Sequence, residues 1–269
     1  MRPRTLRILL LLAILVAVVH HQASDRARFK SWETPVFVTI FPVVGDGSGQ
    51  SRRYVRSLTE GDFDALPAFL TREARRYGLD LPRPMYIDVG EPVTHLPPEP
   101  PVGGGFVARA WWGVRLRWWR WRFDDQGSDA DIIVLARFHD PGERRRLPHS
   151  TGVERIRVAI ANLFATRSMR GQNRVVLLHE ILHTLGASDK YDLATGRPVF
   201  PQGYADPGRS PLHPQRRAEI MAGRIAVSRN EARQAESLAQ VMVGPATAVE
   251  LGWLDATRGG PQAGSAGRR

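Results

Sequence analysis

The chain has 269 residues, of which 42% are hydrophobic and 24% charged, so it can form a real core, and a globally disordered chain is excluded. This length suits one sizeable domain or at most two small ones. The formal net charge is +11, and only Lys30 and Lys190 among the basic residues are lysine. Attraction to phosphates or acidic lipids would explain this charge. A general preference for arginine on solvated surfaces is favoured instead, because no lysine-rich tail or nucleic-acid-binding motif is present, so nucleic acid is not expected as a partner. The absence of cysteine excludes disulfides and thiolate zinc sites.

The N-terminus has the pattern of an export signal. Three arginines in the first seven residues precede an apolar run, Ile8–Val19, which has the length of a signal-peptide core and is short for a full membrane span. His20–Gln22 stand where a cleavage site would need small residues. Residues 1–30 are therefore expected to be a signal peptide or an N-terminal membrane anchor, with the anchor slightly favoured. The protein is expected to be exported, to the periplasm or another extracytoplasmic location, and could be anchored to the inner membrane.

The region before residue 170 is expected to form a mixed α/β layer, because strands alternate with helices along it. Periodicity predicts strands at Thr34–Val44, Met85–Val89, Asp131–Phe138 and Ile156–Ile160. It predicts a helix at Thr59–Tyr77, which Pro67 would kink or restart, and the sequences Gly45–Gly49 and Glu91–Gly105 indicate loops.

A second helix is expected at Phe106–Phe123, which contains five tryptophans interleaved with five arginines. This composition is typical of the lipid headgroup zone. It is equally typical of a helix that packs its aromatic residues on a sheet and extends its arginines into solvent, and this interpretation is favoured. A stacking platform for nucleic acid is the least favoured of the three.

The residues that indicate chemistry lie in the sequence His179-Glu180-Ile181-Leu182-His183. Asn173 is expected to cap a helix from about Arg174 to Leu185. Histidines four residues apart on a helix present both imidazoles to one ion, and Glu180 could reach a water that the ion activates. Gly186 can end the helix in a left-handed conformation.

After this turn Asp189 is expected as the third ligand of a Zn²⁺ ion, because carboxylate oxygen binds zinc and three protein ligands leave a fourth position open. Asp192 and His213 are weaker candidates for the same role. In another kind of zinc hydrolase a later glutamate would serve, here Glu219 or Glu231.

The pattern His-Glu-x-x-His-x-x-Gly-x-x-Asp resembles the metzincin zinc peptidases, and it is most similar to their snapalysin-like variant, in which aspartate replaces the third histidine. The resemblance implies a methionine-bearing turn beneath the metal, and Glu219–Gly223 is similar to it, with Met221 as the floor of the site. It also implies that a tyrosine near the metal stabilises the oxyanion, for which Tyr191 is a weak candidate. The resemblance covers roughly residues 173–223.

The expected fold is therefore α/β (α+β), a metzincin-like zincin fold with a mixed twisted sheet, an active-site helix and a C-terminal part that carries the methionine turn. The peptidase domain would span residues 31–254, with an upper sheet part at about 31–186 and a lower part at about 187–254, followed by a flexible tail at 255–269. In the lower part, Ser228 and Glu231 form a capping-box pattern that predicts a helix to about Gln240, and a last helix is expected at Pro245–Leu251.

The expected function is that of a zinc metalloendopeptidase, a hydrolase in which a zinc-activated water attacks the peptide bond and Glu180 is the general base. The expected partner is a peptide or protein substrate, with membrane contact possible through residues 8–19 and 106–123. The sequence gives no indication of an oligomeric state. Besides the zinc hydrolase with a later glutamate as third ligand, two alternatives remain open: a membrane-anchored binding protein that keeps the fold without catalysis, and an envelope protein whose Trp/Arg segment binds lipid or nucleic acid beside a structural metal.

Overall fold

The computed structural model describes residues 7, 12, 16, 27–93, 96–99, 101, 105–124, 130–144 and 146–255. The expected signal or anchor segment at residues 8–19 lies outside these residues except for Leu12 and Val16, and the expected tail lies outside them after Asp255. Among the described residues, no helix combines the length and the apolar character needed to cross a bilayer.

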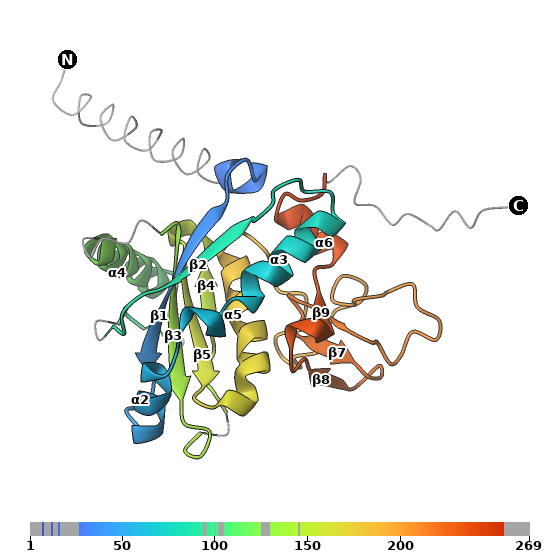
Figure 1. Ribbon diagram of the computed structural model, residues 1–269. Helices are drawn as coiled ribbons and strands as arrows, with labels where there is room; N and C mark the ends of the chain where they lie inside the picture. The colour runs from blue at the N-terminus through green and yellow to red at the C-terminus, as the bar shows by residue number, and fades with distance from the viewer. Residues whose placement is uncertain are drawn as a thin grey trace, which may run out of the picture.

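A five-stranded sheet forms the centre of the molecule, in the order β2-β1-β3-β5-β4 (Figure 1). The strands are β1 (Val36–Val44), β2 (Met85–Val89), β3 (Ile132–His139), β4 (Thr151–Val153) and β5 (Val158–Phe164). The first three neighbouring pairs are parallel, whereas β4 runs antiparallel to β5 at the edge of the sheet. The prediction of a mixed α/β layer is thus confirmed, with a mostly parallel sheet.

The four predicted strands are confirmed, with small differences at their ends, and β4 was not predicted. The predicted start at Ile156 is two residues early, because Glu154–Ile156 forms a 3-10 turn and Arg157 has a left-handed φ of 49°. The extended ladder begins only at Val158, opposite Ile133.

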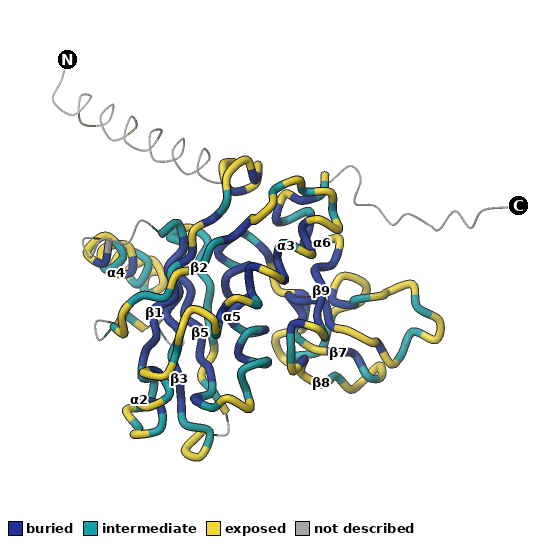
Figure 2. The backbone as a smooth tube through the Cα atoms, viewed as in Figure 1, coloured by how far each residue is buried: buried dark blue, intermediate teal, exposed yellow. Residues whose placement is uncertain are grey.

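Both faces of the sheet are covered, which explains why its strands are apolar on both sides. Side chains alternate strictly: Val38, Ile40 and Val134 belong to the larger core, whereas Phe41 and Leu135 belong to a smaller core on the other face. The strands form the buried centre of the molecule in Figure 2.

Helices α2 (Gly49–Arg56), α3 (Ala65–Arg76) and α5 (Arg170–Thr184) pack into the larger core, and α4 (Phe106–Asp124) covers the opposite face (Figure 1). The helix predicted at Thr59–Tyr77 begins as a separate 3-10 turn at Glu60–Asp62, and α3 then starts at Ala65. Pro67 lies in the first turn of α3, where its missing N–H is not needed, so it restarts the helix and does not kink it. The expected loop at Gly45–Gly49 is correct up to Ser48, whose side chain caps the short, unpredicted helix α2.

The C-terminal part lies on the side of α5 that faces away from the sheet (Figure 1). It contains β6 (Ala218–Glu219) paired with β9 (Val241–Met242), a hairpin of β7 (Arg224–Ala226) and β8 (Ala232–Gln234), a 3-10 turn at Leu238–Gln240, and α6 (Pro245–Glu250). Helix α6 starts with proline as predicted. The helix predicted from Ser228 to Gln240 is wrong: residues 232–234 form β8 and pair with β7, and the side chain of Ser228 accepts from the amides of Asn230 and Glu231 in the hairpin loop.

Candidate metal centre

Helix α5 carries the two histidines and fixes their direction. Leu178, Ile181 and Leu182 are fully buried and fasten the helix to the sheet. The predicted cap at Asn173 is wrong: the helix begins at Arg170, and Asn173 lies inside it. Its side-chain amide instead donates to the carbonyl of Phe164 and accepts from the amide of the same residue, at 2.8 and 3.0 Å. Asn173 therefore ties the start of α5 to the end of β5.

The side chains of His179, His183 and Asp189 converge, as the sequence spacing predicted. The Nε2 atoms of His179 and His183 lie 3.0 Å apart, and Oδ1 of Asp189 lies 3.2 Å from each of them. Two ligands of a tetrahedral zinc ion, with bonds of about 2.0–2.1 Å, would lie about 3.3 Å apart. Within the described part of the chain, no other group of three His, Asp or Glu side chains converges in this way.

The tautomers of both rings favour a cation between them. Nδ1 of His179 lies 3.0 Å from the carbonyl oxygen of Ile220, and Nδ1 of His183 lies 2.8 Å from that of Ala187. Because a carbonyl oxygen only accepts, each Nδ1 carries a proton, and in the neutral imidazole each Nε2 presents a lone pair. The two Nε2 atoms and Oδ1 of Asp189 thus converge on one point, so the residues present fit a small divalent ion.

The pKa shifts of His179 and Asp189 also indicate a site that favours positive charge. Burial lowers the pKa of His179, but the contacts with Asp189, Glu180 and the Ile220 carbonyl outweigh it and leave the pKa raised. Burial likewise opposes the ionised form of Asp189, yet the two imidazoles hold the pKa of its carboxyl well below the ordinary value. Asp189 is therefore ionised at neutral pH, the form in which a carboxylate can bind a metal ion.

Gly186 ends helix α5 and turns the chain towards Asp189. Its φ of 96° lies in the left-handed region, as predicted. The amide of Gly186 donates to the carbonyl of His183, and the amide of Ala187 donates to that of Leu182, which is the hydrogen-bond pattern of a Schellman motif. This turn also delivers the Ala187 carbonyl to the imidazole of His183.

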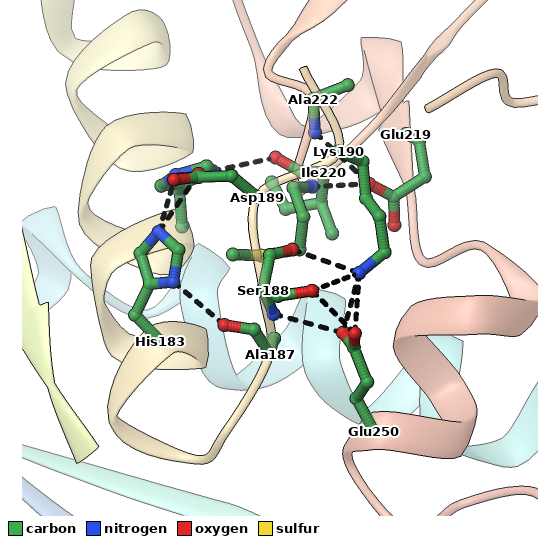
Figure 3. A network of polar contacts seen from close by, with 11 residues as sticks. His183, Ala187, Ser188, Asp189, Lys190, Glu219, Ile220, Ala222 and Glu250 are labelled. Carbon is green, nitrogen blue, oxygen red and sulfur yellow. Dashed lines mark hydrogen bonds and ion pairs between the residues drawn. The ribbon is translucent and has the colours of Figure 1, made fainter. Parts of the chain in front are cut away.

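A buried lysine holds the loop that carries Asp189 (Figure 3). Nζ of Lys190 donates to the carbonyl and the hydroxyl of Ser188, at 3.1 and 2.7 Å, and to both carboxylate oxygens of Glu250 on α6, at 2.7 and 2.8 Å. The side chain of Lys190 is 3% exposed and that of Glu250 30% exposed. We call this set, Ser188, Lys190 and Glu250, the lysine brace. It was not predicted, although Lys190 is one of only two lysines among 38 basic residues.

A buried carboxylate holds the turn that the resemblance assigned to the floor of the site. Oε2 of Glu219 accepts from the amides of Met221 and Ala222, and Oε1 accepts from the amide of Gly244 and the hydroxyl of Thr247. Burial raises the pKa of Glu219 against the hydrogen bonds from Gly244, Thr247 and Met221 and the charge of Lys190. The turn places the Ile220 carbonyl on His179, and the carbonyl of Met221 accepts from the amide of Lys190 at 3.0 Å. Met221 itself is fully buried.

Glu180 lies beside the histidines with one unsatisfied oxygen. The residue is 5% exposed, and its Oε2 atom has no hydrogen-bond partner. Burial raises the pKa of its carboxyl, and the charges of His179 and His183, with a hydrogen bond from the backbone of Gly152 on β4, oppose this shift. A side chain at position 152 would not fit, because its Cβ would lie 2.4 Å from the Glu180 carbonyl oxygen. The edge strand therefore packs directly against the turn of α5 that carries the site.

Tyr191 lies close to the cluster, whereas the rival ligands lie elsewhere. The ring of Tyr191 is centred 6.3 Å from that of His179, and burial, with the nearby charge of Asp189, raises the pKa of its hydroxyl. Asp192 instead accepts from the amide and hydroxyl of Thr195, at 2.7 Å each. His213 contacts the hydroxyl of Tyr204 at 3.1 Å.

The two glutamates considered as third ligands also lie outside the cluster. Glu219 is engaged by the four donors of its turn, and Glu231 is exposed in the hairpin loop between β7 and β8. Neither Glu219 nor Glu231 therefore lies where it could act as the third ligand beside His179 and His183.

A pocket of about 530 Å³ opens beside the cluster. Its lining includes His179, Glu180, Tyr191 and the segment from Arg146 to Ser150 that leads into β4. Residues from β7 and β8 close the other side. Glu180, whose Oε2 has no hydrogen-bond partner, thus lines a space large enough for several substrate atoms and water.

Comparison with known protein families found no family model that matches the chain, and comparison with curated proteins found no significant match.

Proposed function

We propose that this protein is a zinc-dependent peptidase of the metzincin type, with His179, His183 and Asp189 as metal ligands and Glu180 as general base. One observation carries the proposal: the two Nε2 atoms and a carboxylate oxygen converge within 3.2 Å of one another, next to a buried glutamate whose Oε2 lacks a partner and which lines a pocket. Structural histidines would pair their free nitrogens with donors. A site built to activate water needs these lone pairs, an open position and a nearby base.

The chemistry divides between the ion and the protein. A zinc ion held by these ligands would lower the pKa of a water towards about 7 and polarise the substrate carbonyl. Glu180 would accept a proton from this water as the oxygen of the water bonds to the carbonyl carbon. It would then pass the proton to the amide nitrogen as the carbon–nitrogen bond breaks, so that no proton is lost. The raised pKa of Glu180 suits both steps. Tyr191 would donate a hydrogen bond to the developing oxyanion.

A peptide is the substrate that the surroundings favour. Strand β4 pairs with β5 on one side, and no strand pairs with its other side among the residues that the structure describes. The segment before β4 lines the pocket, so an extended chain that added to this edge would pass the cluster. The metzincin assignment is supported by this antiparallel edge strand, by the left-handed Gly186 and by the buried methionine turn. Export, with residues 8–19 as signal or anchor, remains part of the proposal.

Metal content and activity together test the proposal. The wild type is expected to bind one zinc ion per chain and to hydrolyse an unstructured protein such as casein, and His183→Ala and Asp189→Ala are expected to lose the ion. Glu180→Gln should keep the zinc and lose activity by about 10²–10⁴-fold. Glu231→Gln is the matched control, because Glu231 is an exposed glutamate outside the cluster.

Three results would contradict the proposal. Full activity of Glu180→Gln would remove the general base and leave a structural metal. Zinc retained in Asp189→Ala and lost in Glu231→Gln would instead assign the third ligand to the later glutamate. A chain that binds zinc but hydrolyses no peptide as wild type would be a binding module that keeps the fold.

A further inference from the structure

Helix α4 has an unusual outer face. It buries Leu116 and Phe123 against the molecule, and the ring of Phe123 contacts that of Phe41 in the smaller core at 4.8 Å. The indole of Trp112 donates to the carbonyl of Pro98 at 2.8 Å. The helix is therefore held firmly on the sheet. Yet six large apolar residues of the same helix remain 52–84% exposed, namely Phe106, Val107, Trp111, Val114, Trp118 and Trp121.

The exposed residues form one stripe. Val107, Trp111, Val114, Trp118 and Trp121 follow each other at spacings of four, three, four and three residues. At about 100° per residue these five positions fall within an arc of about 80°, centred opposite Leu116 and Phe123. The stripe thus points away from the protein, and Figure 2 shows exposed positions along the outer side of α4. A helix with apolar residues towards solvent on this scale marks a binding surface.

Arginines border the stripe on both sides. By the same helical geometry Arg115 and Arg122 lie along one margin and Arg117 lies along the other. The guanidinium of Arg122 lies over the ring of Trp118, 4.8 Å from its centre. The helix holds a single acidic residue, Asp124, at its last position. An apolar stripe with cationic margins is complementary to the headgroup and upper acyl region of an anionic membrane.

We propose that α4 docks the folded protein onto an anionic lipid surface, with the stripe inserted at the headgroup boundary and the marginal arginines on lipid phosphates. A second copy of this chain is a poorer occupant, because two such helices would bring their arginines together without acidic partners. The helix and the candidate metal centre lie on opposite faces of the sheet, so the docked protein would keep its pocket open to solvent (Figure 1). This inference is independent of the proposed peptidase activity.

The test measures where the tryptophans of α4 lie. The apolar run at residues 8–19 could by itself carry the chain to a vesicle, so total binding is not the readout. The full chain is mixed with vesicles whose phosphatidylcholine or phosphatidylglycerol carries bromine on the acyl chains, and the quenching of tryptophan fluorescence is recorded. Trp32 and Trp253 are buried, so quenching reports mainly on α4. We expect strong quenching with 30% phosphatidylglycerol and weak quenching with phosphatidylcholine alone.

Two variants keep every tryptophan and remove one property each. Arg115→Gln with Arg117→Gln and Arg122→Gln should raise the lipid concentration for half-maximal quenching by about 100-fold, since each cation near an anionic surface contributes about fivefold. Val107→Gln with Val114→Gln should raise it by about tenfold.

Matched controls sit elsewhere on the protein. The charge control is Arg52→Gln with Arg53→Gln and Arg56→Gln on α2, which removes the same charge from exposed positions. The apolar control changes the exposed Leu193, Val199 and Phe200 to Gln. Both controls should quench like the wild type.

Other results would overturn the proposal. These are no quenching with either lipid, quenching that the α4 variants leave unchanged, or equal loss of quenching in the controls. A concentration-dependent dimer that the α4 variants abolish, or oligonucleotide binding without quenching, would assign the face to a second copy or to nucleic acid and would also overturn it.

Discussion

The lysine brace should control both stability and zinc affinity, although none of its members touches the metal site. Glu250→Gln removes a carboxylate that accepts twice from the buried Nζ of Lys190. Breaking a fully buried ion pair from one side costs about 3–5 kcal/mol. The Glu250 side chain is 30% exposed, so water can replace part of the lost interaction, and we expect a loss of about 2 kcal/mol in the free energy of unfolding. Urea unfolding of the zinc-free protein measures this value.

The effect on zinc follows from the position of the brace. Lys190 is hydrogen-bonded to Ser188, the residue before the proposed ligand Asp189, so a loosened brace lets the Asp189 carboxylate move away from the two imidazoles. Loss of such a supporting contact typically weakens metal binding by about 10–100-fold. Competition with a chromogenic chelator measures this affinity in Glu250→Gln, in Lys190→Met and in the control Glu231→Gln. If both brace variants bound zinc and unfolded like the control, the brace would have no positioning role.

The contribution of the brace also has a defined pH dependence. Burial tends to raise the pKa of Glu250, but the hydrogen bonds from Lys190 and Ser188 outweigh burial and lower the pKa below its ordinary value of 4.5. A lowered pKa means that the unfolded chain takes up the proton first as the pH falls, so the stabilisation is complete above about pH 4.5 and is lost below it. The difference in unfolding free energy between wild type and Glu250→Gln should therefore be constant from pH 7 to 5 and shrink towards pH 3. A difference that grew with acid would contradict this assignment.

Three further substitutions test the surroundings of the site. Glu219→Gln replaces an oxygen that accepts two hydrogen bonds by an amide that can only donate, so the free energy of unfolding should fall by about 2–4 kcal/mol in urea titration. Gly152→Ala places a Cβ 2.4 and 2.6 Å from two atoms of α5, so it should lower the free energy of unfolding by about 1–3 kcal/mol and reduce the activity. The control Gly105→Ala, whose Cβ would meet nothing within 4 Å, should change neither quantity. Gly186→Ala forces alanine to a φ of 96° and should lower the melting temperature, with a cost of about 1 kcal/mol or more; an unchanged melting temperature would mean that the turn relaxes.

The parts of the fold that could be predicted are those set by local patterns. Met85–Val89 forms a strand with the bounds that its apolar run indicates, and α6 begins at its proline. The approach of His179 and His183 follows from helical spacing alone, and the turn after them follows from Gly186. Each of these features depends on residues within one or two turns of the chain, so the sequence contains the information directly.

The errors arose where distant contacts outweigh local preference. Residues 232–240 are good helix formers, and Ser228 with Glu231 has the spacing of a capping box. Nevertheless β8 pairs with β7, and Ala235 is fully buried and donates its amide to the carbonyl of Gly223. Asn173 has the composition of a cap, but its amide side chain satisfies the backbone of Phe164. In both cases a backbone partner beyond the next helical turn, 6–12 residues away, competes with the helix start.

The candidate site combines these two kinds of information, and this has a consequence for its metal affinity. Local helical geometry places both imidazoles, but the tautomer of His179 depends on the Ile220 carbonyl 41 residues away, and the position of Asp189 depends on Lys190 and Glu250, which are 60 residues apart. The helix alone would therefore present two imidazoles of undefined tautomer and no carboxylate. Only a C-terminal part folded against α5 completes the proposed ligand set, so under the proposed function zinc binding would stabilise this part by the same free energy that its folding contributes to zinc affinity.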